Sequence, residues 1–169
     1  MNKELIIDNL ESNIKVFDGL CANISQELSK WKPSEDKWSV LEVVNHLYDE
    51  EQLDFRARVK KLLEHDKDWA PIDPRGWVVS KKYYERDFRK SLGNFIDERK
   101  RSIIWLRSLK DEGWDIPLEH PKLGTFTAYK MLSAWLAHDY LQVRQIMRLL
   151  FQYMQTAGKN DMIEYAGKW

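Results

Sequence analysis

Two segments of the sequence carry histidine and other polar residues at helical spacing. His138 and Gln142 stand four residues apart, and His46 stands four residues before Glu50 in an earlier segment. Residues four apart project from one face of a helix, as the paired ligands of helical metal sites do. Neutral imidazole suits zinc, nickel, iron or copper, and three protein ligands leave coordination positions open for water or substrate. The spacing therefore indicates a catalytic type of metal site, in which His46 completes the set begun by His138 and Gln142.

A metal-free interpretation fits the same residues. His46 can hydrogen-bond to Glu50 or to a backbone carbonyl, and Glu50 and Asp54 can be solvated if their helix is slightly rotated. Helical histidines four residues from a polar partner also arise often by chance. The remaining histidines, His65 and His120, are expected at a helix end and in a loop. From spacing alone, both interpretations stay open.

These polar residues interrupt stripes of apolar residues that otherwise follow the helical period. The first stripe consists of Val43, Leu47, Glu50 and Asp54. The second consists of Met131, Trp135, His138, Gln142, Gln145, Leu149 and Tyr153. An ionisable residue at a core position must be paired, liganded or functional. We therefore predict a polar cluster that faces the core, with Asp54, Arg99 and Gln145 in its pocket and Arg99 as the counter-charge.

Four long segments with apolar residues at alternating steps of three and four predict four helices. We expect them from about Lys3 to Lys30, from Ser39 to Glu64, from Ser80 to Lys110, and from Thr125 to just before Gly158. Ser39 followed by Glu42 is a capping box that marks the start of the second helix. Strand signals are sparse, because no Val/Ile-rich alternating run lies between turn dipeptides. The pattern predicts an all-α four-helix bundle.

Two stretches between the predicted helices are rich in turn-forming and aromatic residues, and we expect them to be irregular or only briefly helical. They are His65–Val79 and Glu112–Gly124. The first is longer than the turns that normally join antiparallel helices, so it predicts a long crossover over the end of the bundle. We expect one domain over residues 1–169, with a core at about 5–150 and a tail at 155–169.

Composition excludes several classes of partner. Lys plus Arg and Asp plus Glu both total 27, so the chain has no net basic field to hold nucleic acid. Charges interrupt every apolar run before the ~20 residues that a membrane helix requires, so we expect no membrane partner. The only cysteine, Cys21, cannot form an internal disulfide, and the first residues lack the apolar core of a signal peptide. A cytoplasmic location is expected.

Two longer motifs resemble signatures of the DinB/YfiT-like superfamily. The first is W-S-V-L-E-V-V-N-H-L-Y-D-E-E, residues 38–51. The second combines H-P-K-L-G-T-F-T, residues 120–127, with A-H-D-Y-L-Q-V-R-Q-I, residues 137–146, and resembles the HPxxG and HDxxHxxQ elements of that superfamily. The resemblance implies a four-helix bundle with a long crossover, often a homodimer, and a divalent metal held by three histidines.

Carried onto this sequence, the resemblance maps the first ligand to His46, the second to His138 and the third to Gln142. An amide oxygen is a poorer ligand than imidazole for zinc or nickel. The resemblance therefore implies a degenerate site at which zinc or nickel is weakly bound or absent. Related families include thiol-dependent S-transferases and a mycothiol-dependent isomerase, in which the metal activates a thiol or water.

Three functions are compatible with these observations. The first is a metal-dependent thiol S-transferase or hydrolase-like enzyme, in which Glu50 or Asp49 acts beside the metal in acid–base chemistry. The second is a metal-free bundle that binds a small molecule or thiol above a hydrogen-bonded polar network. The third is a homodimeric interaction protein without catalytic activity. Metal analysis of protein purified without chelator distinguishes the first from the others.

Overall fold

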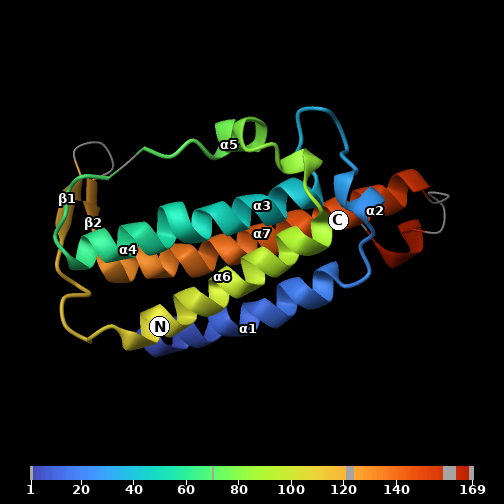
Figure 1. The fold of residues 1–169 in the computed structure, drawn as a ribbon. Coiled ribbons are helices and arrows are strands. Elements are labelled where there is room, and N and C mark those ends of the chain that lie inside the picture. The colour runs from blue at the N-terminus through green and yellow to red at the C-terminus, as the bar shows by residue number, and fades with distance from the viewer. Residues whose placement is uncertain (1, 70, 121–123, 158–162, 168–169) are drawn as a thin grey trace.

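Four long helical rods pack side by side in the part of the chain that the computed structural model describes, residues 2–69, 71–120, 124–157 and 163–167 (Figure 1). The rods are α1 (Lys3–Cys21); the continuous run of α3 (Val40–Glu50), η1 (Glu51–Phe55) and α4 (Arg56–Leu63); α6 (Phe88–Ser108); and α7 (Ala128–Ala157). The predicted all-α four-helix bundle is confirmed. None of the helices in the described residues is both long enough and apolar enough to cross a membrane.

The directions of the rods require a long crossover. Rods α1 and α7 run one way, whereas α3–α4 and α6 run the other way (Figure 1). Because α4 and α6 are parallel, the chain between them returns along the bundle beside α3, rather than over its end as the sequence predicted. This crossover contains the short helix α5 (Pro74–Ser80) and the 3-10 turn η2 (Tyr83–Glu85). The stretch 65–79 is therefore only briefly helical where it is described, and Ala70 lies outside the described residues.

The first predicted helix is two helices. Helix α1 ends at Cys21, and α2 (Gln26–Lys30) begins after a short break. The side chain of Ser25 accepts a hydrogen bond from the backbone nitrogen of Leu28 at 3.1 Å and so caps the start of α2. Because the apolar residues keep their helical spacing across this break, the sequence pattern gives no sign of where α1 ends.

Two other helices begin later than their apolar stripes predict. Helix α6 starts at Phe88 rather than near Ser80, because Asp87 caps it by accepting from the backbone nitrogen of Lys90 at 2.7 Å. Helix α7 starts at Ala128, where the Thr127 hydroxyl accepts from the backbone nitrogen of Lys130 at 3.1 Å. Thr125, where the sequence predicted the start of this helix, lies in a strand instead.

A small hairpin departs from the expectation that the chain has no strands. Strands β1 (Leu118–His120) and β2 (Gly124–Phe126) are antiparallel, with Leu118 opposite Phe126. Each has only three residues, too few for alternation of polar and apolar residues to identify a strand. The rest of the stretch 112–124 is irregular where it is described, and residues 121–123 lie outside the described residues.

The C-terminal tail overlaps the end of α7, which continues to Ala157. A short 3-10 turn, η3 (Glu164–Ala166), follows, and residues 158–162 and 168–169 lie outside the described residues.

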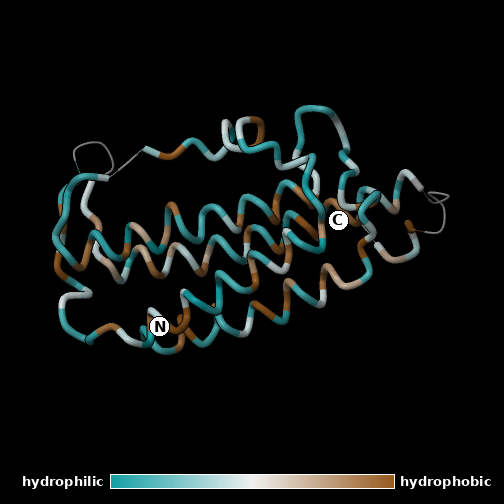
Figure 2. Tube along the Cα trace, in the orientation of Figure 1, coloured by the Kyte–Doolittle hydropathy of each residue, from teal (hydrophilic) through white to brown (hydrophobic). Residues whose placement is uncertain are grey.

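Buried polar residues separate two apolar clusters along the bundle. One cluster includes Leu10, Phe55, Ile103 and Leu132, and the other includes Phe17, Leu47, Phe95 and Ile146. Hydrophobic and hydrophilic residues alternate in short stretches along each long helix (Figure 2). On every rod, buried polar residues lie in sequence between the two clusters: Asn13, Glu50, Glu51, Asp54, Arg99, Asp139 and Gln142. The interrupted stripes of the sequence thus correspond to one polar layer that crosses the whole bundle.

Candidate metal centre

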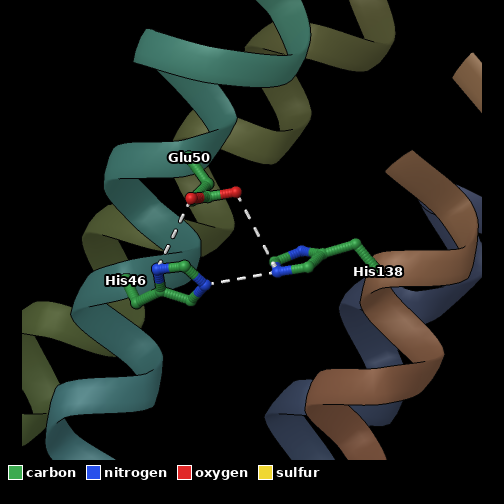
Figure 3. Close-up of side chains that lie close together, drawn as sticks. All are labelled: His46, Glu50 and His138. Carbon is green, nitrogen blue, oxygen red and sulfur yellow. Dashed lines mark hydrogen bonds and ion pairs between the residues drawn. The ribbon is translucent and has the colours of Figure 1, made fainter. Parts of the chain in front are cut away.

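Two imidazoles and a carboxylate meet in this polar layer. The Nε2 atoms of His46 on α3 and His138 on α7 lie 3.2 Å apart. Glu50, one turn after His46, places Oε1 3.7 Å from Nδ1 of His46 and Oε2 4.0 Å from Nε2 of His138 (Figure 3). One ligand atom from each residue lies within 4.8 Å of the other two. The three side chains form a compact donor set of two nitrogens and one carboxylate oxygen.

Local structure fixes both histidines. The capping box predicted from Ser39 and Glu42 is present and sets the start of α3 at Val40, six residues before His46. The ring of Trp38 packs against that of His46, with centroids 4.8 Å apart. The ring of Phe55 packs against His138 at 5.1 Å. Each imidazole is therefore packed against an aromatic ring, which restricts its orientation.

Burial keeps both imidazoles neutral at physiological pH. Desolvation, with a smaller contribution from His138, lowers the pKa of His46 from 6.5 to about 3. Desolvation also lowers the pKa of His138 from 6.5 to about 4, while Asp139 opposes the shift and Arg99 adds to it. A neutral imidazole has a free ring-nitrogen lone pair, which is the form that binds metals.

The carboxyl group of Glu50 is protonated more readily than usual. Burial and the nearby Asp54 raise its pKa from 4.5 to about 8, although Arg58 opposes this shift. Glu50 and Asp54 are also hydrogen-bonded to each other, and Arg58 forms an ion pair with Asp54. In the absence of a metal, Glu50 therefore carries a proton at neutral pH and lends no negative charge to the histidine pair.

Two buried polar atoms at the histidine pair have no hydrogen-bond partner among the described residues. They are Nδ1 of His46 and Oε1 of Gln142. Gln142 lies one turn after His138 and places Nε2 3.0 Å from Nε2 of that histidine. A buried polar atom without a partner normally costs about 1–3 kcal/mol, so native proteins seldom leave one unless it serves a ligand.

The donor set fits a divalent metal ion. Two nitrogens bound to a tetrahedral zinc ion at ~2.0–2.1 Å lie about 3.3 Å apart. The observed Nε2–Nε2 separation of 3.2 Å agrees with that value, and Oε2 of Glu50 lies 4.0 Å from Nε2 of His138. Two histidines and one carboxylate bind zinc in catalytic sites and non-haem iron in facial triads.

Sequence comparison assigns the family. The family model of the DinB superfamily matches residues 9–146. The chain belongs to the DinB superfamily. The resemblance inferred from residues 38–51 and 120–146 is therefore confirmed. No curated protein matches the chain.

A solved structure shares the fold of this DinB-superfamily chain. YfiT from Bacillus subtilis, described as a probable metal-dependent hydrolase with an unusual four-helix bundle topology, matches with a TM-score of 0.76. The two are 22% identical, and the match covers 87% of this chain and 85% of YfiT. A likeness at this identity establishes the shared bundle topology.

Arg99 lies in the same polar layer as the candidate metal centre and does not line the open pocket beside it. Its Nε donates to Oε1 of Glu51 at 2.8 Å, and its two terminal nitrogens donate to the carboxylate of Asp139 at 2.6 and 2.8 Å. Burial alone would lower the pKa of Arg99, but these two carboxylates raise it above its ordinary value. The sequence placed Arg99 as a counter-charge in the pocket, yet its ion pairs direct the guanidinium into the core.

Asp49 also points away from the histidine pair. It accepts hydrogen bonds from Nζ of Lys81 at 2.8 Å and from the hydroxyl of Tyr83, both in the crossover segment. Asp49 thus attaches the crossover to α3, which is a structural contact. By contrast, Asp54 contacts Glu50, and Gln145 lines the open pocket described below.

The sequence patterns missed several partners of these residues. Glu51 and Asp139 were not identified, although both lie within the quoted motifs. Tyr83 lies in a segment that the sequence assigned to the third helix. The π-helical turn η1, Glu51–Phe55, was also missed, and such turns occur frequently at functional sites.

Proposed function

We propose that the chain binds a divalent metal ion through His46, His138 and Glu50, and uses it in a hydrolase or thiol-transfer reaction. The observation that carries this proposal is the convergence of the three donor atoms within 4.8 Å in a buried layer. YfiT, which shares the fold, is described as a probable metal-dependent hydrolase, and this supports the same class of chemistry. Glu50 takes the third ligand position that the resemblance mapped to Gln142.

The residues of the centre have separate roles in this proposal. His46 and His138 are neutral and present nitrogen lone pairs, and Glu50 becomes a charged ligand when it gives up its proton. A divalent ion held there would lower the pKa of a water or thiol and so supply a nucleophile near neutral pH. Gln142, whose side-chain oxygen has no partner among the described residues, is placed to accept the hydrogen bond that orients that water or thiol.

The carboxylate distinguishes this ligand set from three histidines. An anionic oxygen donor favours zinc, iron or manganese relative to nickel, for which an all-nitrogen set is better suited. We therefore propose zinc, iron or manganese as the resident metal.

Metal binding by the purified chain tests the proposal. Protein prepared without chelator is assayed for bound metal and then titrated calorimetrically with Zn²⁺, Mn²⁺ and Ni²⁺. We expect one equivalent of metal per chain, loss of that binding in His138→Ala, and no change in His65→Asn. His65 is exposed and has a φ of 56°, which asparagine tolerates, so this variant controls for the loss of a histidine elsewhere. Wild-type protein that binds none of these ions contradicts the proposal.

A further inference from the structure

An open pocket adjoins the candidate metal centre. It has a volume of about 920 Å³ and lies between α7 and the segment 33–38 that precedes α3. Pockets of this size accommodate small molecules of drug-like dimensions. Its polar lining includes Lys37, Gln142, Arg144, Gln145 and Arg148.

Two residues of the pocket wall contact the histidines directly. Gln142 lines the pocket and places its amide nitrogen 3.0 Å from Nε2 of His138. Trp38 also lines the pocket, and its ring packs against that of His46 at 4.8 Å. The pocket therefore leads to the two imidazoles, and a molecule bound in it can reach the metal ligands.

The charges that line the pocket are all positive. Lys37, Arg144 and Arg148 contribute cations, and none of the described residues that line the pocket is an aspartate or glutamate. Arg144 and Arg148 are exposed and form no ion pair or hydrogen bond with any described residue. Lys37 is partly neutralised by Asp36, which lies 2.7 Å away. Since the whole chain has no net charge, this local excess of cations is a specific feature of the pocket.

Buried polar groups complete the binding surface near the metal ligands. Gln142 is only 8% exposed, and its Oε1 has no hydrogen-bond partner among the described residues. Gln145 and Gln152 follow on the same side of α7 and also line the pocket. These amides can hydrogen-bond to the neutral, polar part of a ligand that extends from the arginines of the pocket to the metal centre.

We propose that this pocket binds an anionic small molecule, a carboxylate or phosphate ester, whose acidic end contacts Arg144 and Arg148. Arginine recognises both groups by charge-assisted, often bidentate hydrogen bonds. Arg144 and Arg148 follow His138 by six and ten residues, a rise of about 9 and 15 Å along the helix. The acidic group of the ligand thus binds roughly two to three helical turns beyond His138 along α7. This inference rests on the proposed function for the reacting end, whereas anion binding itself requires no metal.

S-Methylglutathione and its diethyl ester are matched probes for the test. They share one skeleton, but the ester lacks both carboxylates, and the methylated sulfur cannot supply a thiolate to a metal. Binding is measured by calorimetry with metal-free and zinc-loaded protein at the same ionic strength, because exposed charges are screened by salt. Wild type, Arg144→Gln/Arg148→Gln and the control Lys130→Gln are compared. Lys130 is exposed on α7, lies outside the pocket, and forms no ion pair with a described residue.

We expect wild-type protein to bind S-methylglutathione in both metal-free and zinc-loaded forms. Binding should be about tenfold weaker for the diethyl ester and for the double arginine variant, since each loses charge-assisted hydrogen bonds, and unchanged for Lys130→Gln. Equal affinity for acid and ester, no loss in the arginine variant, an equal loss in Lys130→Gln, or no binding by wild type each overturns the anion site. Failure of zinc binding alone contradicts the metal proposal and leaves anion binding by metal-free protein as a separate result.

Discussion

The Nε2 atoms of His46 and His138 lie 3.2 Å apart, although 92 positions separate the two residues in the chain. Both imidazoles are neutral, so only one proton or one metal ion can join them at this distance. If one ring donates its Nε2 proton to the other, Nδ1 of His46 still lacks a partner among the described residues. A metal bound between the two Nε2 atoms uses one lone pair from each ring and leaves the ring proton of each histidine on Nδ1, which in His46 lies 3.7 Å from Oε1 of Glu50.

Replacement of Glu50 tests whether it is the third metal ligand. In Glu50→Gln the shape of the side chain is kept and the anionic oxygen is lost. We expect metal affinity to fall by more than the ~10- to 100-fold typical of residues that only support ligands. Calorimetric titration with zinc measures this loss, and Glu64→Gln, at the exposed end of α4, serves as the matched control. Unchanged affinity in folded Glu50→Gln would remove Glu50 from the ligand set.

The stability of metal-free protein should fall as pH rises from 6.5 to 8.5. Burial and Asp54 raise the pKa of Glu50 from 4.5 to about 8. Within that range the folded chain retains a proton that the unfolded chain has lost, so increasing pH favours unfolding. Below pH 6.5 the lowered pKa values of His46 and His138 produce the opposite trend, because the unfolded chain then binds the extra protons.

Urea unfolding in the presence of a chelator measures this pH dependence. Glu50→Gln cannot ionise, so its free energy of unfolding should vary less between pH 6.5 and 8.5 than that of wild type. Glu64→Gln should keep the wild-type slope. If wild type and Glu50→Gln have parallel profiles, Glu50 is already ionised in the folded protein at neutral pH.

Local sequence determined much of the bundle, and for that reason it could be predicted. The capping box of Ser39 and Glu42 depends on four consecutive residues, and it is present as expected. The interruption of the apolar stripes at His138 and Gln142 depends on helical periodicity alone. Each helix therefore revealed which of its residues face the core, and so the polar layer.

Contacts between helices account for what the sequence did not predict. Arg99 was placed correctly on the inward face of its helix, but its partners, Glu51 and Asp139, are 48 and 40 positions away. The distance between Glu50 and His138 likewise depends on how α3 packs against α7. Helical spacing shows that Glu50 and His46 lie on the same face of one helix. It does not show which side chain of another helix lies within contact distance of them.

The ion cluster of Arg99, Glu51 and Asp139 should be essential for stability. All three side chains are at most 1% exposed, so Arg99→Met leaves two buried carboxylates without their counter-charge. Breaking a buried ion pair in this way typically costs about 3–5 kcal/mol. Urea unfolding measures the loss, and Arg99→Lys, which retains the charge but not the bidentate contact, should lose less.

An exposed arginine provides the control for this cluster. Arg107 forms ion pairs with Asp8 and Glu11 at the surface, where such pairs contribute at most about 1 kcal/mol. Arg107→Met should therefore unfold nearly as wild type does. Similar losses in Arg99→Met and Arg107→Met would show that burial of the cluster has no special energetic role.

Gln142→His should raise the affinity of the centre for zinc and nickel. The amide of Gln142 lies 3.0 Å from Nε2 of His138, and residue 142 is one helical turn further along α7. An imidazole there adds a nitrogen donor to His46, His138 and Glu50, and restores the three-histidine pattern that the superfamily resemblance implies. Since an imidazole binds these metals better than an amide does, we expect an increase of at least about tenfold.

Gln152→His is the matched control for Gln142→His. Gln152 lines the same pocket from the same helix but lies ten residues further along, a rise of about 15 Å, so a histidine there cannot reach the centre. Zinc and nickel titrations of wild type and both variants, with circular dichroism to verify folding, provide the comparison. Tighter binding by Gln142→His alone indicates that residue 142 borders the metal. If folded Gln142→His binds zinc and nickel no more tightly than Gln152→His does, a side chain at position 142 cannot reach a metal held by His46 and His138. Gln142 then acts only on a ligand in the pocket.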